Sequence, residues 1–253
     1  PGEYKIEYET LKDYIEKNYN TKVTPDAHLE LDLGLDSLDI VEILSFIEMS
    51  FGIKITEEEF TDIKNVLDIA KFVKEKGGKF SENEVDWKTI LNQDTDIKLP
   101  SSAWVGKFMR VLLKPMFSIY FRLKQAGHDK IPSESAIYIG NHQSFLDALI
   151  FNQAIPAAKM KDTYYLGTVV HFGSPLRKYL ADRGNVLIID INKNLKETLQ
   201  VSAKVLKEGK NLVIFPEGAR TRDGEIQDFK KTFAILSKEL NIPVVPFGIK
   251  GSY

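Results

Sequence analysis

The sequence at residues 33–51 reads LGLDSLDIVEILSFIEMSF. Apolar residues in its second half recur three and four positions apart, which places them on one face of a helix. They are Ile40, Ile43, Leu44, Ile47 and Phe51. Gly52 follows as a glycine that ends the helix. The pattern predicts an amphipathic helix that starts at Leu38, with Ser37 as the N-cap whose hydroxyl satisfies a free backbone N–H.

Helical segments are predicted on both sides of this stretch. Charged residues separate apolar ones at helical spacing from about Tyr4 to Tyr19, and another helix is expected from Asn65 to Lys76. The latter ends at the pair Gly77-Gly78. Its inward residues are expected to be Val66, Ile69, Ala70 and Val73. Residues 1–77 are therefore predicted to form a four-helix bundle.

After this bundle the sequence changes in character. Residues 78–100 are predicted to be a linker, which a capping box at Ser81 and Glu84 makes only partly flexible. From residue 101 to 253 short apolar runs alternate with helical stretches, which is typical of an α/β layered domain. Strands are expected at 136–140, 164–167, 186–190, 212–215 and 244–249, and helices at 146–153, 194–208 and 229–240. The predicted fold class is α + α/β.

Composition narrows the classes of function. The formal net charge is −2, yet residues 1–80 hold 10 Lys and Arg against 18 Asp and Glu, which leaves 24 against 18 for residues 81–253. The acidic first part argues against nucleic acid as its partner, whereas the basic second part suits an acidic protein, a phosphorylated substrate or an anionic membrane surface. The absence of cysteine excludes disulfides, thiolate metal sites and a cysteine nucleophile. No metal site is predicted.

Residues 103–125 contain no acidic side chain, and a narrow polar stripe runs along them. The stripe consists of Lys107, Arg110, Lys114, Ser118, Arg122 and Gln125. Bulky apolar residues cover most of the remaining circumference, and Pro115 is expected to kink the helix. Two interpretations stay open: a helix buried against the domain, or a helix lying in a lipid interface. No run of about 18 uncharged apolar residues predicts a membrane span, so membrane contact is expected to be peripheral.

His142 and Asp147 stand in the sequence NHQSFLD, residues 141–147, which follows a predicted strand. If a helix begins near Leu146, the turn before it lets the two side chains face each other. A carboxylate that accepts from one imidazole nitrogen fixes the tautomer, so the other nitrogen can take a proton from an alcohol. The pattern predicts a general base, His142, and its partner, Asp147.

A second polar segment, FPEGARTR at residues 215–222, also follows a predicted strand. Gly218 and the paired arginines Arg220 and Arg222 suit a loop that holds a phosphate through bidentate hydrogen bonds. In this interpretation Glu217 orients an arginine or a hydroxyl group.

The first unit resembles an acyl carrier protein over about residues 4–77. The resemblance rests on one motif and on an acidic helix face without local cationic partners. The motif is Gly34 with Asp36-Ser37-Leu38, and the acidic residues are Asp39, Glu42 and Glu48. The resemblance implies that a phosphopantetheinyl transferase attaches 4'-phosphopantetheine to Ser37 and that the acidic face docks basic partner enzymes. A phosphodiester at a helix N-terminus gains about 0.3–1 kcal/mol from the helix dipole.

Residues 101–253 resemble the lysophosphatidic acid acyltransferase family of glycerolipid acyltransferases. The matching segments are residues 141–147, the Pro-Glu-Gly-Ala-Arg of 216–220 and Val244-Val245-Pro246. The resemblance implies that His142 is the general base and Asp147 its partner. It also implies acceptor-phosphate binding by Glu217, Gly218 and Arg220, and a place for Pro246 beside the acyl-donor site.

The sequence departs from that family in two places. An arginine commonly follows the Ile-Asp of the family's second motif, whereas this chain reads Ile189-Asp190-Ile191-Asn192, which puts the phosphate ligand from that segment in doubt. Relatives usually continue beyond the block in which this chain ends at Tyr253, and the first residue is not Met. Both ends are therefore expected to be cut.

Together these features predict a carrier domain fused to an O-acyltransferase, a piece of a larger bacterial multidomain enzyme of phospholipid synthesis or remodelling. The acyl thioester donor would be carried on Ser37, and the acceptor would be a lysophospholipid or glycerol-phosphate hydroxyl. The expected location is cytoplasmic and peripheral, on the inner face of the membrane, and relatives of this architecture imply an acyl-activating ligase domain as a further partner. Two alternatives remain: a non-catalytic carrier or docking fragment, and an acyltransferase with an amine or non-phosphorylated acceptor.

Overall fold

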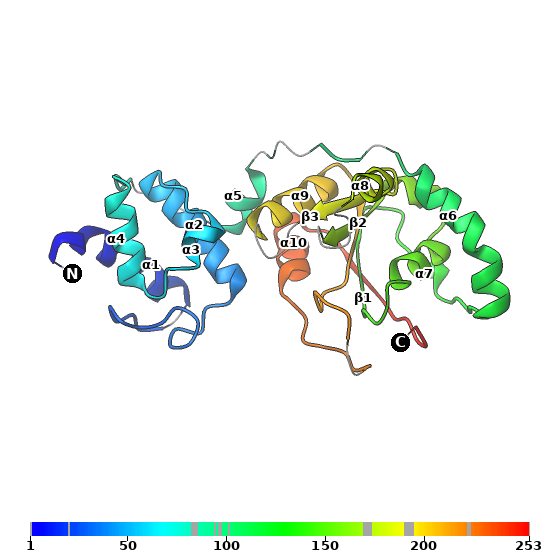
Figure 1. The fold of residues 1–253 in the computed structure, drawn as a ribbon, viewed down its shortest axis with the longest axis horizontal. Coiled ribbons are helices and arrows are strands. Elements are labelled where there is room, and N and C mark those ends of the chain that lie inside the picture. Colours follow the sequence, from blue (N-terminus) through cyan, green and yellow to red (C-terminus); the bar gives the residue numbers. More distant parts are fainter. Residues whose placement is uncertain are drawn as a thin grey trace. The chain divides into compact units, whose positions relative to one another are not determined.

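The computed structural model describes residues 2–19, 21–81, 86–93, 95, 98–100, 102–168, 174–189, 195–221 and 224–252. The chain divides into two compact units, Pro1–Gln93 with Asn192–Lys196 and Asp94–Ile191 with Glu197–Tyr253. The first change of unit comes after Gln93, inside the segment predicted as the linker. Figure 1 traces the helices and strands of each unit. Each unit has a fold of its own.

The first unit is helical. It contains a 3-10 turn, η1 (Gly2–Tyr4), followed by α1 (Lys5–Tyr19), α2 (Ser37–Phe51), the single turn α3 (Glu57–Phe60), α4 (Val66–Glu75) and α5 (Trp87–Asn92). The buried residues of α4 are Val66, Ile69, Ala70 and Val73, the four predicted to face inward. Its N-cap, Asn65, accepts a hydrogen bond from the backbone N–H of Asp68 at 2.8 Å. These residues pack with Leu11, Ile15, Ile43 and Ile47, which are fully buried on α1 and α2.

The start of α2 differs from the prediction. Asp36 Oδ1 accepts from the backbone N–H of Leu38 at 2.9 Å and of Asp39 at 3.1 Å. Asp39 Oδ2 accepts in return from the N–H of Asp36 at 2.7 Å. The prediction that Ser37 is the N-cap is therefore wrong, because this reciprocal capping box makes Asp36 the cap and Ser37 the first helical residue. The helix ends as predicted at Gly52, whose φ of 70° is left-handed.

Part of the predicted linker is helical. Asp86 caps α5 by accepting from the backbone N–H of Thr89 at 2.7 Å, and Ile90 and Leu91 on this helix are buried. Glu84, the second residue of the predicted capping box, lies outside the described residues. The described start of this helix is therefore set by Asp86.

The second unit is built on a five-stranded sheet in the order β3-β2-β4-β1-β5, with every neighbouring pair parallel. The strands are β1 (Ile137–Gly140), β2 (Thr163–Thr168), β3 (Val186–Ile189), β4 (Asn211–Ile214) and β5 (Val244–Phe247). Parallel neighbours need crossover connections. The crossovers contain α7 (Asp147–Ala154) with η4 (Ala157–Asp162), α8 (Pro175–Asp182), α9 (Leu195–Lys207) and α10 (Thr232–Leu240). All five strands overlap predicted ones, whereas α8 was not predicted.

The strand order brings the ends of β1 and β4 together. Ile139 of β1 pairs with Ile214 of β4 on one side and with Pro246 of β5 on the other. The proline is tolerated because β5 is an edge strand, where a missing N–H breaks no ladder. Since the carboxyl ends of parallel neighbours meet at one edge of the sheet, the segments that follow β1 and β4 emerge side by side.

Helix α6 (Trp104–Pro115) precedes the sheet and continues into a π-helical turn, η2 (Met116–Tyr120); another short turn, η3 (His128–Lys130), follows. α6 lies beside α7 (Figure 1). Arg110 Nη1 donates to the carbonyl oxygens of Asn152 at 3.2 Å and Ile155 at 2.5 Å, near the end of α7. Gln153 Nε2 donates in return to the Arg110 carbonyl at 3.0 Å. Of the polar stripe, Arg110 therefore faces the protein, whereas Lys107, Lys114 and Ser118 are exposed.

The apolar side of α6 and η2 is exposed. No residue of α6 is fully buried, so the helix lies on the surface of the second unit, with one side packed on α7 and the other side exposed. The exposed large side chains are Trp104, Phe108, Val111, Leu112, Ile119 and Tyr120. Within the described ranges, no helix has the length and hydropathy needed to cross a bilayer.

Candidate active site

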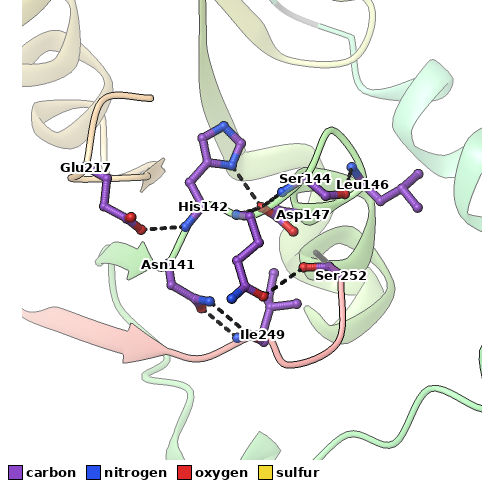
Figure 2. A network of polar contacts seen from close by, with 9 residues as sticks. Asn141, His142, Ser144, Leu146, Asp147, Glu217, Ile249 and Ser252 are labelled. Atoms are coloured by element: carbon purple, nitrogen blue, oxygen red, sulfur yellow. Dashed lines mark hydrogen bonds and ion pairs between the residues drawn. The ribbon is translucent and has the colours of Figure 1, made fainter. Parts of the chain in front are cut away.

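The turn between β1 and α7 holds His142 against the first residue of the helix (Figure 2). His142 Nδ1 lies 2.9 Å from Asp147 Oδ2. The same carboxylate oxygen accepts from the backbone N–H of Gln143 at 2.6 Å and of Ser144 at 2.7 Å. His142 and Asp147, which were predicted to face each other, are therefore in contact, and the turn folds around the Asp147 carboxylate.

Asp147 is fully buried, with 0% of its side chain exposed. Burial favours the neutral acid, but the hydrogen bonds from His142 and from the Ser144 N–H outweigh it and hold the pKa of Asp147 below its ordinary value. Asp147 is thus a carboxylate at neutral pH. A carboxylate at Nδ1 keeps the proton on that nitrogen, which leaves Nε2 of His142 as the acceptor.

The segment after β4 holds the backbone and the ring of His142. Glu217 Oε1 accepts from the His142 N–H at 2.6 Å, and the N–H of Thr221 donates to the His142 carbonyl at 2.9 Å. The ring of Phe215 stacks on the imidazole, with centroids 4.3 Å apart and an interplanar angle of 19°. The two predicted motifs therefore form one site, and Phe215 and Thr221 are members that sequence analysis missed.

Glu217 connects two loops through its carboxylate. While Oε1 accepts from His142, Oε2 accepts from the backbone N–H of Gln227 at 3.0 Å, and the residue is buried. The implied role of Glu217 in phosphate binding stays a prediction. Because both oxygens accept from backbone groups, the geometry supports a contribution through the shape of the loop.

Arg220 is brought to the first motif by an aromatic contact. Its guanidinium carbon lies 3.7 Å from the centroid of the Phe145 ring, and both residues are exposed. Gly218, also in this loop, has a left-handed φ of 74°. Arg222 lies outside the described residues, as do residues 190–192 of the divergent second motif. Phe145 lies in the motif at residues 141–147, but its role depends on Arg220, and the spacing of residues in the sequence does not reveal this contact.

Asn141 ties the turn to the segment after β5. Its Nδ2 donates to the Ile249 carbonyl at 2.8 Å, and its Oδ1 accepts from the Ile249 N–H at 2.7 Å (Figure 2). Just before it, Gly140 leaves room for the ring of Phe247, which would lie 2.2 Å from a Cβ at position 140. The residue before Asn141 must therefore be glycine for Phe247 to pack there.

In the first unit, Ser37 is exposed at the first position of α2. The capping hydrogen bonds are made by Asp36 and Asp39, so the serine hydroxyl stays outside the cap. The positive end of the helix dipole favours a phosphate at this position. The exposed hydroxyl of Ser37 there fits attachment of a phosphate-linked group.

The acidic face predicted on α2 is partly used inside the unit. Asp39 belongs to the capping box, and Glu42 accepts from the hydroxyls of Tyr19 at 2.9 Å and Tyr14 at 3.4 Å. Burial raises the pKa of Glu42, although both tyrosine hydrogen bonds act in the opposite direction. The predicted acidic face is therefore only half exposed, and the hydroxyls of α1 hold Glu42 against the unit.

Two protein-family models match the chain. The model described as Acyltransferase covers residues 122–250, and the model described as Phosphopantetheine attachment site covers residues 9–73. The first range contains both halves of the site around His142, and the second contains Ser37. A phosphopantetheine attachment domain is therefore present in the first unit.

Among curated proteins, the chain is similar to 1-acyl-sn-glycerol-3-phosphate acyltransferases of plants. It is 30% identical to that of Limnanthes douglasii over 145 residues, which are 54% of this chain and 48% of the relative. It is 31% identical to that of Cocos nucifera over 121 residues, 47% of this chain and 38% of the relative. Each match spans less than half the length of these relatives.

Among solved structures, the chain is similar to the 1-acyl-sn-glycerophosphate (LPA) acyltransferase PlsC from Thermotoga maritima. The sequence identity is 24% and the TM-score 0.47, with 59% of each chain covered.

Proposed function

The chain belongs to the Acyltransferase family, and on that basis we propose that it moves a fatty acyl group from a thioester to the hydroxyl of a lysophospholipid or glycerol phosphate. The donor is the acyl thioester carried at Ser37 by its own attachment domain, and the reaction serves phospholipid synthesis or remodelling. The names of the plant relatives support the acceptor class. The observation that carries the proposal is the 2.9 Å contact between His142 Nδ1 and Asp147 Oδ2.

In the proposed reaction His142 is the general base. Its Nε2 takes the proton of the acceptor hydroxyl while the oxygen attacks the thioester carbonyl carbon. The C–S bond then breaks, the new ester forms, and the proton on His142 passes to the leaving thiolate. Asp147 stabilises the imidazolium between these two transfers, and such general-base help is worth about 10²–10⁴ in rate.

Binding of the acceptor is assigned to the loop after β4. Arg220 presents a guanidinium that can hold a phosphate through two hydrogen bonds. Its stacking on Phe145 keeps that group beside the turn that contains His142. The acceptor hydroxyl and the acceptor phosphate would thus be held by neighbouring segments.

The attachment domain gives the proposal its donor. Phosphopantetheine, when bound, supplies a thiol, which this cysteine-free chain lacks. Because the carrier and the acyltransferase are in one chain, the effective concentration of one for the other is roughly millimolar.

We also propose peripheral membrane contact through the exposed side of α6. Trp104, Phe108 and Leu112 are exposed there, with Lys107 and Lys114 also exposed on this helix. Each lysine near an anionic surface contributes up to about 1 kcal/mol. This arrangement would bring the site to acceptors that reside in the membrane.

Two large side chains of α6 and η2 do not belong to this surface. Arg110 is bound to backbone carbonyls near the end of α7, and Phe117 is only 2% exposed. Neither side chain is therefore available to a headgroup or an acyl chain.

The test is a chase experiment on the loaded protein. A phosphopantetheinyl transferase and acyl coenzyme A load the full chain, and intact mass reports the acyl group. Addition of lysophosphatidic acid should remove that mass and produce phosphatidic acid, whereas the loaded His142→Ala variant should keep it. Retention of the acyl group by the wild type would refute the proposal. Transfer to monoacylglycerol or an amine in preference to lysophosphatidic acid would refute its acceptor.

A further inference from the structure

The side chain of Lys230 occupies the space beside Gly218. A Cβ at position 218 would lie 3.0 Å from Lys230 Cε and 3.2 Å from its Nζ. Two reasons favour glycine at position 218. Glycine adopts the left-handed φ of 74° without strain, and it leaves room for the Lys230 side chain. The ammonium group of Lys230 is thus placed at the loop that carries Arg220.

Two hydrogen bonds donated by backbone N–H groups hold the segment before α10 against this loop. The Gln227 N–H donates to Glu217 Oε2 at 3.0 Å, and the Lys230 N–H donates to the Pro216 carbonyl at 2.9 Å. Glu217 Oε1 meanwhile accepts from the His142 N–H at 2.6 Å. One buried carboxylate therefore fixes both the base and the segment that carries Lys230.

We propose that Lys230 binds the acceptor phosphate together with Arg220. The inference rests on the proposed function, whose acceptor it concerns. Within the part of the chain that the structure describes, Lys230 has no carboxylate partner, so its charge is available to an anion. An ammonium is a compact charge with three donors, and it complements the planar guanidinium of Arg220 around a tetrahedral phosphate.

The experiment compares Lys230→Gln with Lys231→Gln in the full chain. Lys231 is the matched control because its replacement removes the same charge one residue away, at the N-cap of α10. Lys230→Gln should raise the KM for lysophosphatidic acid about tenfold, as expected for a lost hydrogen bond to a charged group, with kcat nearly unchanged. Lys231→Gln should leave KM unchanged, and Lys230→Arg should retain most of the affinity.

A second acceptor separates phosphate binding from a general loss of structure. Monoacylglycerol has the reacting hydroxyl without the phosphate, so Lys230→Gln should not change its KM. Inorganic phosphate should inhibit the wild type more strongly than Lys230→Gln. Equal effects of Lys230→Gln and Lys231→Gln, or equal KM increases for both acceptors, would overturn the assignment of Lys230.

The variant Gly218→Ala tests whether the Lys230 side chain needs the space beside Gly218. The added methyl group forces the end of the Lys230 side chain to shift by a few tenths of an ångström, so the effects of Gly218→Ala and Lys230→Gln on the KM for lysophosphatidic acid should be less than additive. Fully additive effects would contradict a shared origin. Should the wild type fail to acylate any acceptor, the proposed function fails, while calorimetric titration of wild type and Lys230→Gln with glycerol 3-phosphate still decides whether Lys230 binds phosphate.

Discussion

The guanidinium of Arg220 lies over the ring of Phe145, with its central carbon 3.7 Å from the ring centroid. This contact joins the two halves of the candidate site, because Phe145 lies between His142 and Asp147 in sequence and Arg220 follows β4. An aromatic ring is a suitable support for a phosphate-binding arginine, since it orients the guanidinium without using its N–H donors.

Phe145→Ala should weaken acceptor binding. A cation–π contact at an exposed site is worth about 0.5–1 kcal/mol, which predicts a KM for lysophosphatidic acid about two to five times higher. Phe145→Trp should keep the wild-type KM because it retains an aromatic face. Steady-state kinetics with both variants provide the measurement, and an unchanged KM in Phe145→Ala would show that Arg220 needs no such support.

His142→Ala and Asp147→Asn should both lose acyl transfer. Loss of the base itself should cost about 10²–10⁴ in rate, and Asp147→Asn should have a smaller or equal effect because it disturbs the tautomer of a base that remains. Transfer is measured from the loaded chain, with Ser37 modification followed by intact mass as the control for a folded first unit. Wild-type turnover by His142→Ala would end the general-base assignment.

The capping box of α2 predicts a contrast between adjacent residues. Asp36→Ala should lower the free energy of unfolding of the first unit by about 0.5–2 kcal/mol, because it removes an N-cap. Ser37→Ala should change this stability little while abolishing the phosphopantetheine mass increment. Chemical denaturation and intact mass together give the measurement. A stability loss at Ser37 as large as that at Asp36 would contradict the assignment of the cap.

Glu42 predicts a pH-dependent difference in stability. Burial raises the pKa of this carboxyl, so its contribution to stability is fully present below the ordinary value of 4.5 and is lost as pH rises through the raised pKa. Glu42→Gln keeps a neutral side chain at this position. The Tm of Glu42→Gln relative to wild type should therefore rise between about pH 4 and about pH 7.

The matched control for Glu42 is Glu30→Gln, which neutralises an exposed carboxylate in the same unit. Thermal unfolding followed by circular dichroism, over a series of pH values, gives the comparison. A Tm difference for Glu42→Gln that stays constant with pH, or that follows the curve of Glu30→Gln, would contradict the prediction.

The exposed side of α6 predicts binding to vesicles. Replacement of Trp104, Phe108 and Leu112 by Ser should abolish co-sedimentation, whereas Lys107→Gln with Lys114→Gln should mainly remove the preference for anionic lipid. Arg110→Gln is the control on the opposite face, and it should instead lower Tm because carbonyls near the end of α7 lose their donor. Absence of vesicle binding by the wild type would refute the membrane contact.

Much of the fold could be predicted where local chemistry decides it. The inward residues of α4, the glycine at the end of α2 and the five strands follow from periodicity and from terminating residues close in sequence. The predicted start of α2 was wrong because the side chains of Asp36, Ser37 and Asp39 are all of types that can cap a helix N-terminus. The reciprocal pair Asp36 and Asp39 satisfies more backbone groups than a single serine hydroxyl.

The sequence predicts which residues belong to the candidate site better than it predicts the contacts between them. The spacing of His142 and Asp147 indicated a facing pair because the turn between strand and helix lies within one motif. The partners of Arg110, Arg220 and Glu217 come from segments far along the chain, so no local pattern contains them. The same limit hid Lys230, whose relation to the loop depends on how the backbone returns to Pro216.

The hydrogen bond between the His142 N–H and Glu217 spans 75 positions of sequence, and it sits where β1 and β4 pair. Contacts of such separation form slowly, since a long loop must close before they gain stability. The first unit depends on closer neighbours and can fold earlier as synthesis proceeds. On a ribosome, the serine on α2 would then be ready for modification before Glu217 has been added, so the acyl carrier matures ahead of its catalyst.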